Sequence, residues 1–327
     1  MMRFLRTVFG LDESHRMFQA DVLRWKCFVP HPFWVGSRGY ALRYKGEIAA
    51  FGCLIPCRFL TQSGTVASCD VIDWAASKVV PGAGVMLYRH ILGLTGTMIN
   101  IGGTADARSV LPKIGFEARV QRYGYTRVLQ PWRHFQQTQP IDWKSPLRLA
   151  RDYRELGRAA QAVGPTLKAR RVQSFDRVPA GVFPDPSVTQ QVVCARDPEA
   201  LNYFLACPAA EMDAYLLERN HTPAGYFLLS RVGCECRIAD LWIRSPDGQA
   251  WAEAYAAATA AARTDPGITR ITVAASLPLQ TGALQKAGYR RTHAEPVFVR
   301  DPGRLLGDGN DLALNLLEND GYYWKRD

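Results

Sequence analysis

The pattern of hydrophobic and polar positions in the first 130 residues predicts a mixture of helices and strands. Phe18, Val22 and Trp25 recur at helical spacing, so they share one face of an opening helix. The segments that follow are a hairpin at 40–60, a central strand at 66–76, a helix at 83–95, a strand at 97–102, a short helix at 105–113 and a long strand at 117–130. Strands interspersed with helices predict an α/β (α+β) fold in which a mixed sheet is layered with helices.

The second half of the chain repeats this order. Five segments of the first half have similar counterparts in the second half, and the counterparts follow one another in the same order. Three of these pairs are "CDVIDWAAS" (69–77) with "CRIADLWIR" (236–244), "INIGGT" (99–104) with "ITVAAS" (271–276), and "KIGF" (113–116) with "KAGY" (286–289). We interpret residues 15–135 as a first repeat and 190–325 as a second repeat of one fold.

The repeats predict a division of the chain into three parts. Residues 1–140 form an N-terminal domain and residues 191–327 a C-terminal domain. Residues 141–190 are a basic connection, with a helix that begins at Ser145-Pro146 and a Pro-rich irregular segment at 166–190.

Composition is that of a soluble globular protein, with 47% hydrophobic and 21% charged residues. No apolar run reaches the roughly 18 residues that span a bilayer, and the start of the chain lacks a signal-peptide pattern. We therefore expect a cytoplasmic protein. The 8 cysteines are scattered and have no zinc-finger spacing, so we expect reduced, mostly buried thiols and no metal site.

The net charge of +10 is concentrated in the first part of the chain. Residues 1–140 hold 17 Lys/Arg against 8 Asp/Glu, whereas residues 178–327 hold 14 against 18. A basic half can attract nucleic acid, an anionic glycan or a phosphorylated cofactor. The arginines are dispersed and not clustered with aromatic residues, which disfavours nucleic acid.

Two glycines stand where the central strand leads into a helix, in "VVPGAG" at 79–84. Gly82 and Gly84 are suited either to a tight turn or to a cradle in which backbone N–H groups at a helix start bind phosphate. With "KIGF" after the last helix, this order resembles the GNAT superfamily of acyl-CoA-dependent N-acetyltransferases. The family's pyrophosphate loop reads Arg/Gln-x-x-Gly-x-Gly/Ala, and Val79 here replaces its Arg/Gln.

The resemblance implies two tandem GNAT-like acyl-CoA N-acyltransferase domains, with acetyl-CoA or another acyl-CoA as donor. The cofactor-binding residues implied in the first repeat are Trp74, Val79, Val80, Gly82, Ala83, Gly84, Val85 and Thr104. The second repeat carries "SPDGQA" at 245–250 in the same place, where the Asp247 carboxylate would repel a diphosphate. We therefore expect the donor in the first repeat.

Both repeats depart from a second sequence signature of the family. Many members carry a Tyr that protonates the leaving thiolate, whereas this chain has Leu111 and Leu284 at that position. The family often takes its base from the central strand, which makes Asp73 the first candidate for a catalytic base, with Asp70 and Glu47 behind it. Asp240 occupies the equivalent place in the second repeat, so a shared structural role for the two aspartates remains open.

Trp25, His31 and Trp34 are the predicted acceptor-binding residues, because an aromatic-rich loop can line a groove and stack on a sugar ring. Core packing is the alternative for these residues. The predicted reaction moves an acyl group from acyl-CoA to an amine or hydroxyl of a small-molecule or glycan acceptor, with amino sugars and glycan precursors as candidates. Two alternatives remain: a FemAB-like aminoacyl transferase that uses aminoacyl-tRNA, and a catalytically inert GNAT pair that serves as a binding or regulatory module.

Overall fold

The two repeats fold with the same order of elements, as the sequence predicts. The structure is a computed structural model that describes residues 1–137, 142–162, 167–185, 191–308 and 311–323. The first repeat contains α2 (Ala20–Cys27), β1 (Gly39–Tyr44), β2 (Glu47–Thr61), β3 (Gly64–Ala76), α3 (Ala83–Leu92), β4 (Met98–Ile101), α4 (Ala105–Val110) and β5 (Glu117–Val128). The second contains α7 (Pro198–Leu205), β8 (Glu211–Arg219), β9 (Thr222–Val232), β10 (Glu235–Ile243), α8 (Gly248–Arg263), β11 (Arg270–Ala275), α9 (Pro278–Lys286) and β12 (Arg290–Arg300).

Further elements lie before, between and beside the repeats. These are α1 (Met2–Phe9), α5 (Pro131–Gln137), α6 (Ser145–Ala162), β6 (Lys168–Val172), β7 (Val193–Cys194) and the short 3₁₀ turns Arg16–Phe18, Leu111–Ile114 and Ala180–Val182. The prediction of an irregular segment at 166–190 is wrong for β6, which pairs antiparallel with β8. Its sequence, "KARRV", is a mostly exposed strand whose charges suit the edge of a sheet. The predicted domain boundaries near 140 and 190 lie outside the described residues, so they stay predictions.

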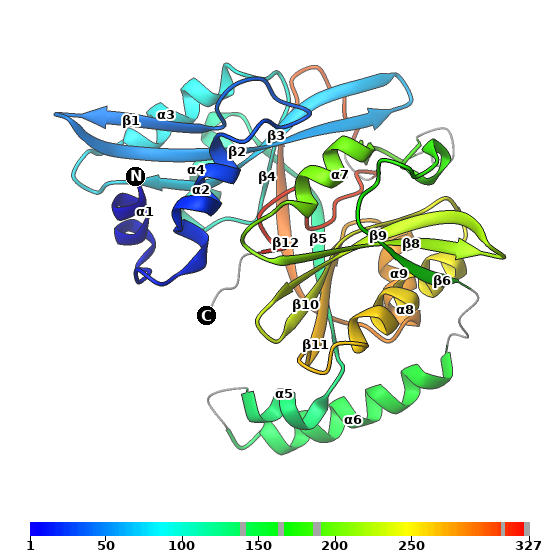
Figure 1. Ribbon diagram of the computed structural model, residues 1–327. Helices are drawn as coiled ribbons and strands as arrows, with labels where there is room; N and C mark the ends of the chain where they lie inside the picture. Colours follow the sequence, from blue (N-terminus) through cyan, green and yellow to red (C-terminus); the bar gives the residue numbers. More distant parts are fainter. Residues whose placement is uncertain (138–141, 163–166, 186–190, 309–310, 324–327) are drawn as a thin grey trace.

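One continuous mixed sheet joins the repeats, where the sequence predicted two. In the described part of the chain its order is β1-β2-β3-β4-β12-β5-β11-β10-β9-β8-β6, with β7 beside β2. The last strand of each repeat has changed places: β5 pairs with β11 of the second repeat, and β12 pairs with β4 of the first. In Figure 1, β5 and β12 stand side by side between the two halves of the molecule.

Each repeat contains one parallel strand pair that separates along its length. β3 and β4 share a single paired position, Asp70 opposite Ile99, although β3 continues to Ala76. β10 and β11 are paired from Glu235 to Ile238, and β10 then continues to Ile243. Each repeat therefore contains a gap in its sheet beside the central strand, which we call the first and the second splay.

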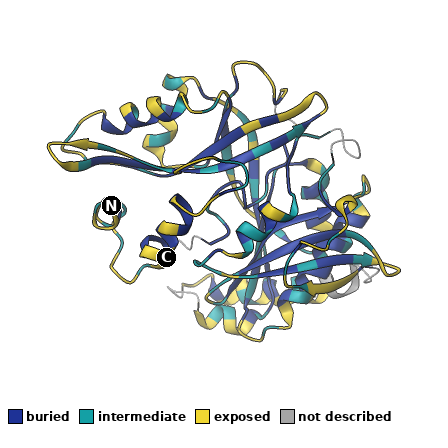
Figure 2. Cartoon of the chain, turned by 45° about the horizontal axis from the view of Figure 1, so that its top comes forward, coloured by how far each residue is buried: buried dark blue, intermediate teal, exposed yellow. Residues whose placement is uncertain are grey.

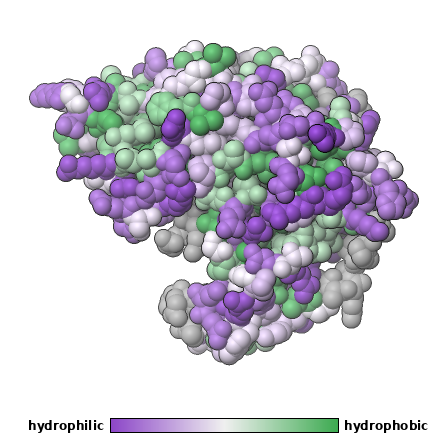
Figure 3. All heavy atoms as spheres, in the orientation of Figure 1, coloured by the Kyte–Doolittle hydropathy of each residue, from purple (hydrophilic) through white to green (hydrophobic). Residues whose placement is uncertain are grey.

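Helices cover the sheet and bury its apolar positions. α3 packs on β1, β2 and β3 around Leu54, Val71, Leu87 and Ile91, all of them buried. α8 packs on β9 and β10, and α9 on β12. Figure 2 shows buried residues concentrated along the strands, while the outer faces of the helices are exposed. On the face drawn in Figure 3, hydrophilic side chains surround smaller hydrophobic patches.

A core substitution on the exchanged strand tests whether the repeats unfold together. Val297 of β12 is fully buried and lies opposite Ile101 of β4 and Val120 of β5. We expect Val297→Ala to lower the free energy of unfolding by about 2 kcal/mol, because it opens a cavity in this shared layer. Hydrogen exchange should then show lost protection in both β2 and β9. Val79→Ala, at a position that is 84% exposed, is the control. Loss of protection in only one repeat would contradict shared unfolding.

Candidate functional site

A cavity of about 730 Å³ lies where the two repeats meet. The first repeat contributes the ends of β3 and β4, at Asp70–Trp74 and Asn100–Thr104. The second contributes residues of β10, β11 and β12, and the C-terminal segment contributes Asn319–Gly321. β5 completes the wall, so the exchanged strands form part of the lining. The first splay opens directly into this cavity.

A bulge in β3 and a polar side chain from β4 shape the first splay. Ile72 pairs with Cys53 and Ala75 with Phe51, so β3 has one extra residue here, and Asp73 adopts a φ of 53°. Such a bulge bends a strand and interrupts its pairing. Beside it, the Asn100 side chain donates to the Val71 carbonyl at 3.3 Å. On the side of β4, the backbone groups of β3 beyond this point therefore face a gap, while the other side stays paired with β2.

The start of α3 lies next to this splay. Gly82 caps the helix with a φ of 81°, which favours glycine. Gly84 packs tightly: a Cβ there would lie 3.0 Å from the Ala76 Cβ. Trp74 connects the helix start to the cavity, because its ring lines the cavity and its Nε1 donates to the Gly84 carbonyl at 3.0 Å.

The other predicted cofactor-binding residues lie in different environments. Val79 is exposed, Val80 packs against the α3 core cluster, and Val85 is partly buried in the first helical turn. The Ala83 N–H already donates to the Val80 carbonyl, so it is less suited to bind phosphate than its neighbours. The Thr104 hydroxyl lines the cavity but caps α4 by accepting from the Ala107 N–H at 3.2 Å.

The equivalent helix start in the second repeat is occupied by a side chain. Asp247 caps α8, and its carboxylate accepts from the N–H groups of Gln249 and Ala250 at 3.0 and 3.3 Å. These are groups that a phosphate would need. The carboxylate also makes this helix start repulsive to an anion.

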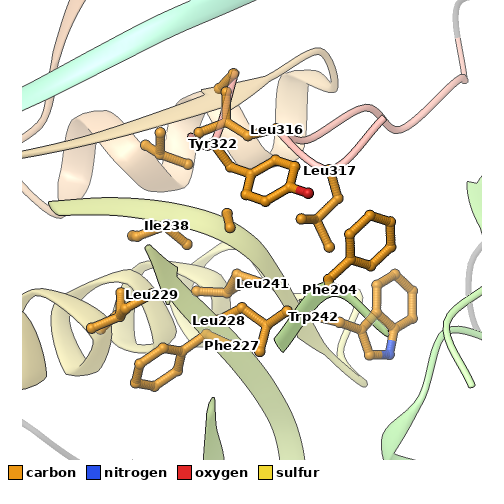
Figure 4. Close-up of a cluster of buried hydrophobic side chains, with 14 of the residues drawn as sticks. Phe204, Phe227, Leu228, Leu229, Ile238, Leu241, Trp242, Leu316, Leu317 and Tyr322 are labelled. Atoms are coloured by element: carbon orange, nitrogen blue, oxygen red, sulfur yellow. The ribbon is translucent and has the colours of Figure 1, made fainter. Parts of the chain in front are cut away.

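The second splay is filled by the chain itself. Leu316 donates its N–H to the carbonyl of Ala239 in β10 at 3.2 Å. Ser276, just after β11, accepts from Leu314 N–H and donates to the Leu312 carbonyl. Figure 4 shows Leu316, Leu317 and Tyr322 packed over Ile238 and Leu241. The C-terminal segment, residues 311–323, thus bridges β10 and β11 and then reaches the cavity wall.

Buried charges hold this segment in place. Arg196 contacts both Asp240 of β10, at 2.8 Å, and Glu318 of the C-terminal segment. Burial would lower the pKa of Arg196, but the two carboxylates outweigh it and raise that pKa well above its usual value. Asn315 adds a hydrogen bond to the other oxygen of Asp240.

The predicted catalytic carboxylates lie in three different environments. Asp73 forms a buried ion pair with Lys26 of α2. Asp70 lines the cavity, and burial raises its pKa well above the usual value, which favours the neutral acid. Glu47 is exposed at the β1–β2 turn and does not line the cavity. The structure therefore brings Asp70 and Asp73 to the first splay and leaves Glu47 away from it.

The predicted acceptor residues do not line the large cavity. Trp25 stacks on Tyr203 with 5.0 Å between ring centroids, and with His31 it borders a separate void of about 20 Å³. This void is of the size of one water molecule. Burial, with help from Arg38, lowers the pKa of His31 to about 3. Trp34 is partly buried and donates to the Ser37 carbonyl. Trp25 and His31 are therefore packed in the interior, which was the alternative to acceptor binding.

Sequence reasoning missed the polar side chains that do line the cavity. They are Arg122 and Thr126 of β5, Glu235 and Arg237 of β10, Arg270 and Thr272 of β11, and Thr292, His293 and Glu295 of β12. Glu235 is buried, which alone would raise its pKa, but Arg237 and Arg270 lower it. Polar residues at alternate positions of an otherwise apolar strand were the available signal, but only the exchange of strands places them together.

Among the residues that the structure describes, no three His, Cys, Asp or Glu side chains converge as metal ligands. Within the described ranges, no helix is both long and apolar enough to cross a bilayer.

Comparison with known proteins identifies the fold. No protein-family model and no curated sequence matches the chain. A GCN5-related N-acetyltransferase from Anabaena variabilis is 12% identical, with a TM-score of 0.58 over 91% of this chain and 68% of that one. A probable N-acyltransferase from Enterococcus faecalis is 9% identical, with a TM-score of 0.55 over 94% and 70%. N-myristoyltransferase from Saccharomyces cerevisiae, solved with bound myristoyl-CoA, is 10% identical, with a TM-score of 0.61 over 92% and 76%.

At these identities the similarity concerns the fold, and it confirms the predicted GNAT-type architecture.

The ion pair between Lys26 and Asp73 leads to a prediction about stability. Lys26→Met or Asp73→Asn alone should lower the free energy of unfolding by about 3 kcal/mol, because each leaves a buried charge without its partner. Asn tolerates the positive φ at position 73, so backbone strain does not confound the change. The double variant should recover most of the loss in urea denaturation. Additive losses would show that the two side chains are not coupled.

Proposed function

We propose that this protein is an acyl-CoA-dependent acyltransferase that binds its donor in the first splay and its acceptor in the adjoining cavity. The observation that carries the proposal is the difference between the splays. The first opens into a cavity of about 730 Å³, whereas residues 311–323 fill the second. Open space between the diverging strands of a GNAT-type fold is where an extended thioester arm would lie.

The start of α3 supports binding of the donor's diphosphate in this repeat. The first N–H groups of a helix have no partner within it, and the helix dipole favours an anion there. A Cβ built on Gly82 would meet no atom within 4 Å, so the space beside this residue is open to a phosphate. The excess of basic residues in 1–140 favours the same anion.

The cavity lining supports a polar acceptor. Buried Arg122 lines it from β5, and buried Glu235 and Arg237 line it from β10; such groups recognise hydrogen-bonding and charged substituents. We therefore propose a small molecule or a peptide-like chain with an amine or hydroxyl nucleophile. The lining combines Arg122, Arg237 and Arg270 with the carboxyl groups of Asp70, Asp73, Glu235, Glu295 and Asp320. This mixture of charges disfavours a polyanion such as tRNA and with it the aminoacyl-tRNA alternative.

The leaving thiolate needs a proton, and this chain has leucine where the resemblance implies the family's proton-donating Tyr. Leu111 is fully buried in the 3₁₀ turn after α4, and Leu284 is fully buried in α9. Neither side chain can donate a proton. The proton must therefore come from water, from the acceptor itself or from another group in the cavity.

Placing a carboxylate at the start of α3 tests the donor site. We expect Val85→Glu to weaken acetyl-CoA binding by about 10- to 100-fold in calorimetry, because the new charge repels the diphosphate. An acidic residue in the first turn also suits the helix dipole, so the fold should survive. Gln249→Glu, exposed at the start of α8, is the matched control and should bind as the unaltered protein does.

The outcomes separate the alternatives. Equal weakening by both substitutions would contradict donor binding in the first repeat. Binding of acetyl-CoA without release of free CoA, against a panel of amines and alcohols, would favour the inert binding module. Failure to bind any acyl-CoA would overturn the proposal.

A further inference from the structure

The exchanged strand β12 carries a histidine and a glutamate past the end of β4. β12 runs antiparallel to β4, and the Gly102 N–H donates to the Pro296 carbonyl at 3.0 Å. Glu295 therefore lies beside the glycines that follow β4: a Cβ on Gly102 would sit 3.7 Å from the Glu295 carboxyl carbon. His293 and Glu295 both line the large cavity at the mouth of the first splay.

Glu295 is fixed by a buried arginine from the other exchanged strand. Arg122 of β5 donates to Glu295 at 2.7 Å and to the Asn315 carbonyl at 2.7 Å, and its side chain is 3% exposed. Burial favours the neutral form of Glu295, but His293 and Arg122 outweigh it and lower its pKa to about 2. The carboxylate is therefore ionised at neutral pH.

His293 faces this carboxylate. Its Nε2 lies 3.6 Å from a Glu295 oxygen, an ion-pair separation slightly longer than a hydrogen bond. Its side chain is 57% exposed, so the imidazole is reachable from the cavity. A carboxylate beside an imidazole stabilises the protonated ring.

The backbone around His293 is arranged to seat the ring. β12 has one extra residue at Thr292, since Arg291 pairs with Tyr125 and His293 with Gly124. The Thr292 hydroxyl donates to the Gly124 carbonyl at 3.1 Å, which closes this bulge. The imidazole lies directly over Gly124, where any Cβ would overlap it. Bulges that redirect a side chain are common beside active sites.

We infer that His293 is the general base of acyl transfer and that Glu295 is its positioning residue. This inference rests on the function proposed above. Neutral imidazole accepts one proton from the amine or hydroxyl as its lone pair forms the bond to the thioester carbonyl carbon. The C–S bond then breaks with its electron pair on sulfur, and the imidazolium returns the proton to that thiolate. One residue thus supplies both proton transfers, including the one for which the family uses Tyr.

Other charged groups surround the same cavity. They are Arg122 of β5, Glu235 and Arg237 of β10, Arg270 of β11, Asp70 and Asp73 of β3, and Asp320 of the C-terminal segment. Glu295 is the carboxylate paired with the ring. Its removal should therefore leave the imidazole without the partner that orients it.

The test uses the full chain with acetyl-CoA, measuring release of free CoA with water and with a panel of amines as acceptors. We expect His293→Gln to reduce turnover by about 100-fold or more, with unchanged acetyl-CoA affinity. Glu295→Gln should lower kcat and leave the KM for acetyl-CoA unchanged, because the ring loses its orientation while the donor site is untouched. Gly124→Ala should displace the ring and reduce turnover, whereas His90→Gln, exposed on α3, is the control.

NMR of the His293 ring gives a readout that needs no acceptor. The ring resonances should shift in Glu295→Gln, because the ring loses its carboxylate partner, and stay unchanged in His90→Gln. Unchanged ring resonances in Glu295→Gln, or normal turnover in a folded His293→Gln variant that still binds acetyl-CoA, would overturn the role of His293 and leave the proposed function intact. Failure of the unaltered protein to bind any acyl-CoA would instead overturn the proposed function, and this inference with it.

Discussion

The pairing of β12 between β4 and β5 is the interaction on which the rest of the structure depends. It runs from Arg290 opposite Thr126 to Val299 opposite Glu117, and it connects strands from both repeats into one sheet. Without it, β4 would end the sheet of the first repeat, and β5, which pairs with β11, would end the sheet of the second. The cavity exists because this seam carries polar residues of β5 and β12 across the open end of the first splay.

The repeats share a fold but differ in what fills their splays. In the second repeat, Asp247 occupies the helix start and residues 311–323 bridge the separated strands. The hydrogen bond of Leu316 to Ala239 lies at the β10 bulge, the counterpart of the β3 bulge at Asp73. The same backbone feature thus supports an internal segment in one repeat and leaves space in the other. The segment that fills the second splay also forms part of the cavity wall, because it continues to Asn319–Gly321.

The sequence predicted the elements well because their determinants are local. Strand alternation, helical spacing and glycines at strand ends specified β1 to β5 and their counterparts within a few residues. The exchange of β5 and β12 was not predictable, since the two strands have 12 and 11 residues and both mix polar with apolar positions, so the local sequence does not select the partner strand. Consequently His293 and Glu295 were missed, while Trp25 and His31 were selected for their residue types alone. A partner distant in sequence, Tyr203 for Trp25, makes these residues part of the core.

The two central-strand aspartates show why the base is better sought on β12. Each lies at or next to a bulge of its central strand, and each is paired with a buried cation, Lys26 for Asp73 and Arg196 for Asp240. The second repeat retains this arrangement although its splay is filled, so the pair has a use that does not depend on a substrate. That use is to neutralise a carboxylate where the strand bends and the splay begins. A carboxylate committed to a buried cation is a poor proton acceptor, because protonation would leave that cation uncompensated. His293 is not paired with a cation: its Nδ1 lies 3.1 Å from the Thr292 hydroxyl and its Nε2 faces the Glu295 carboxylate, so a proton taken up by the ring leaves no buried cation uncompensated.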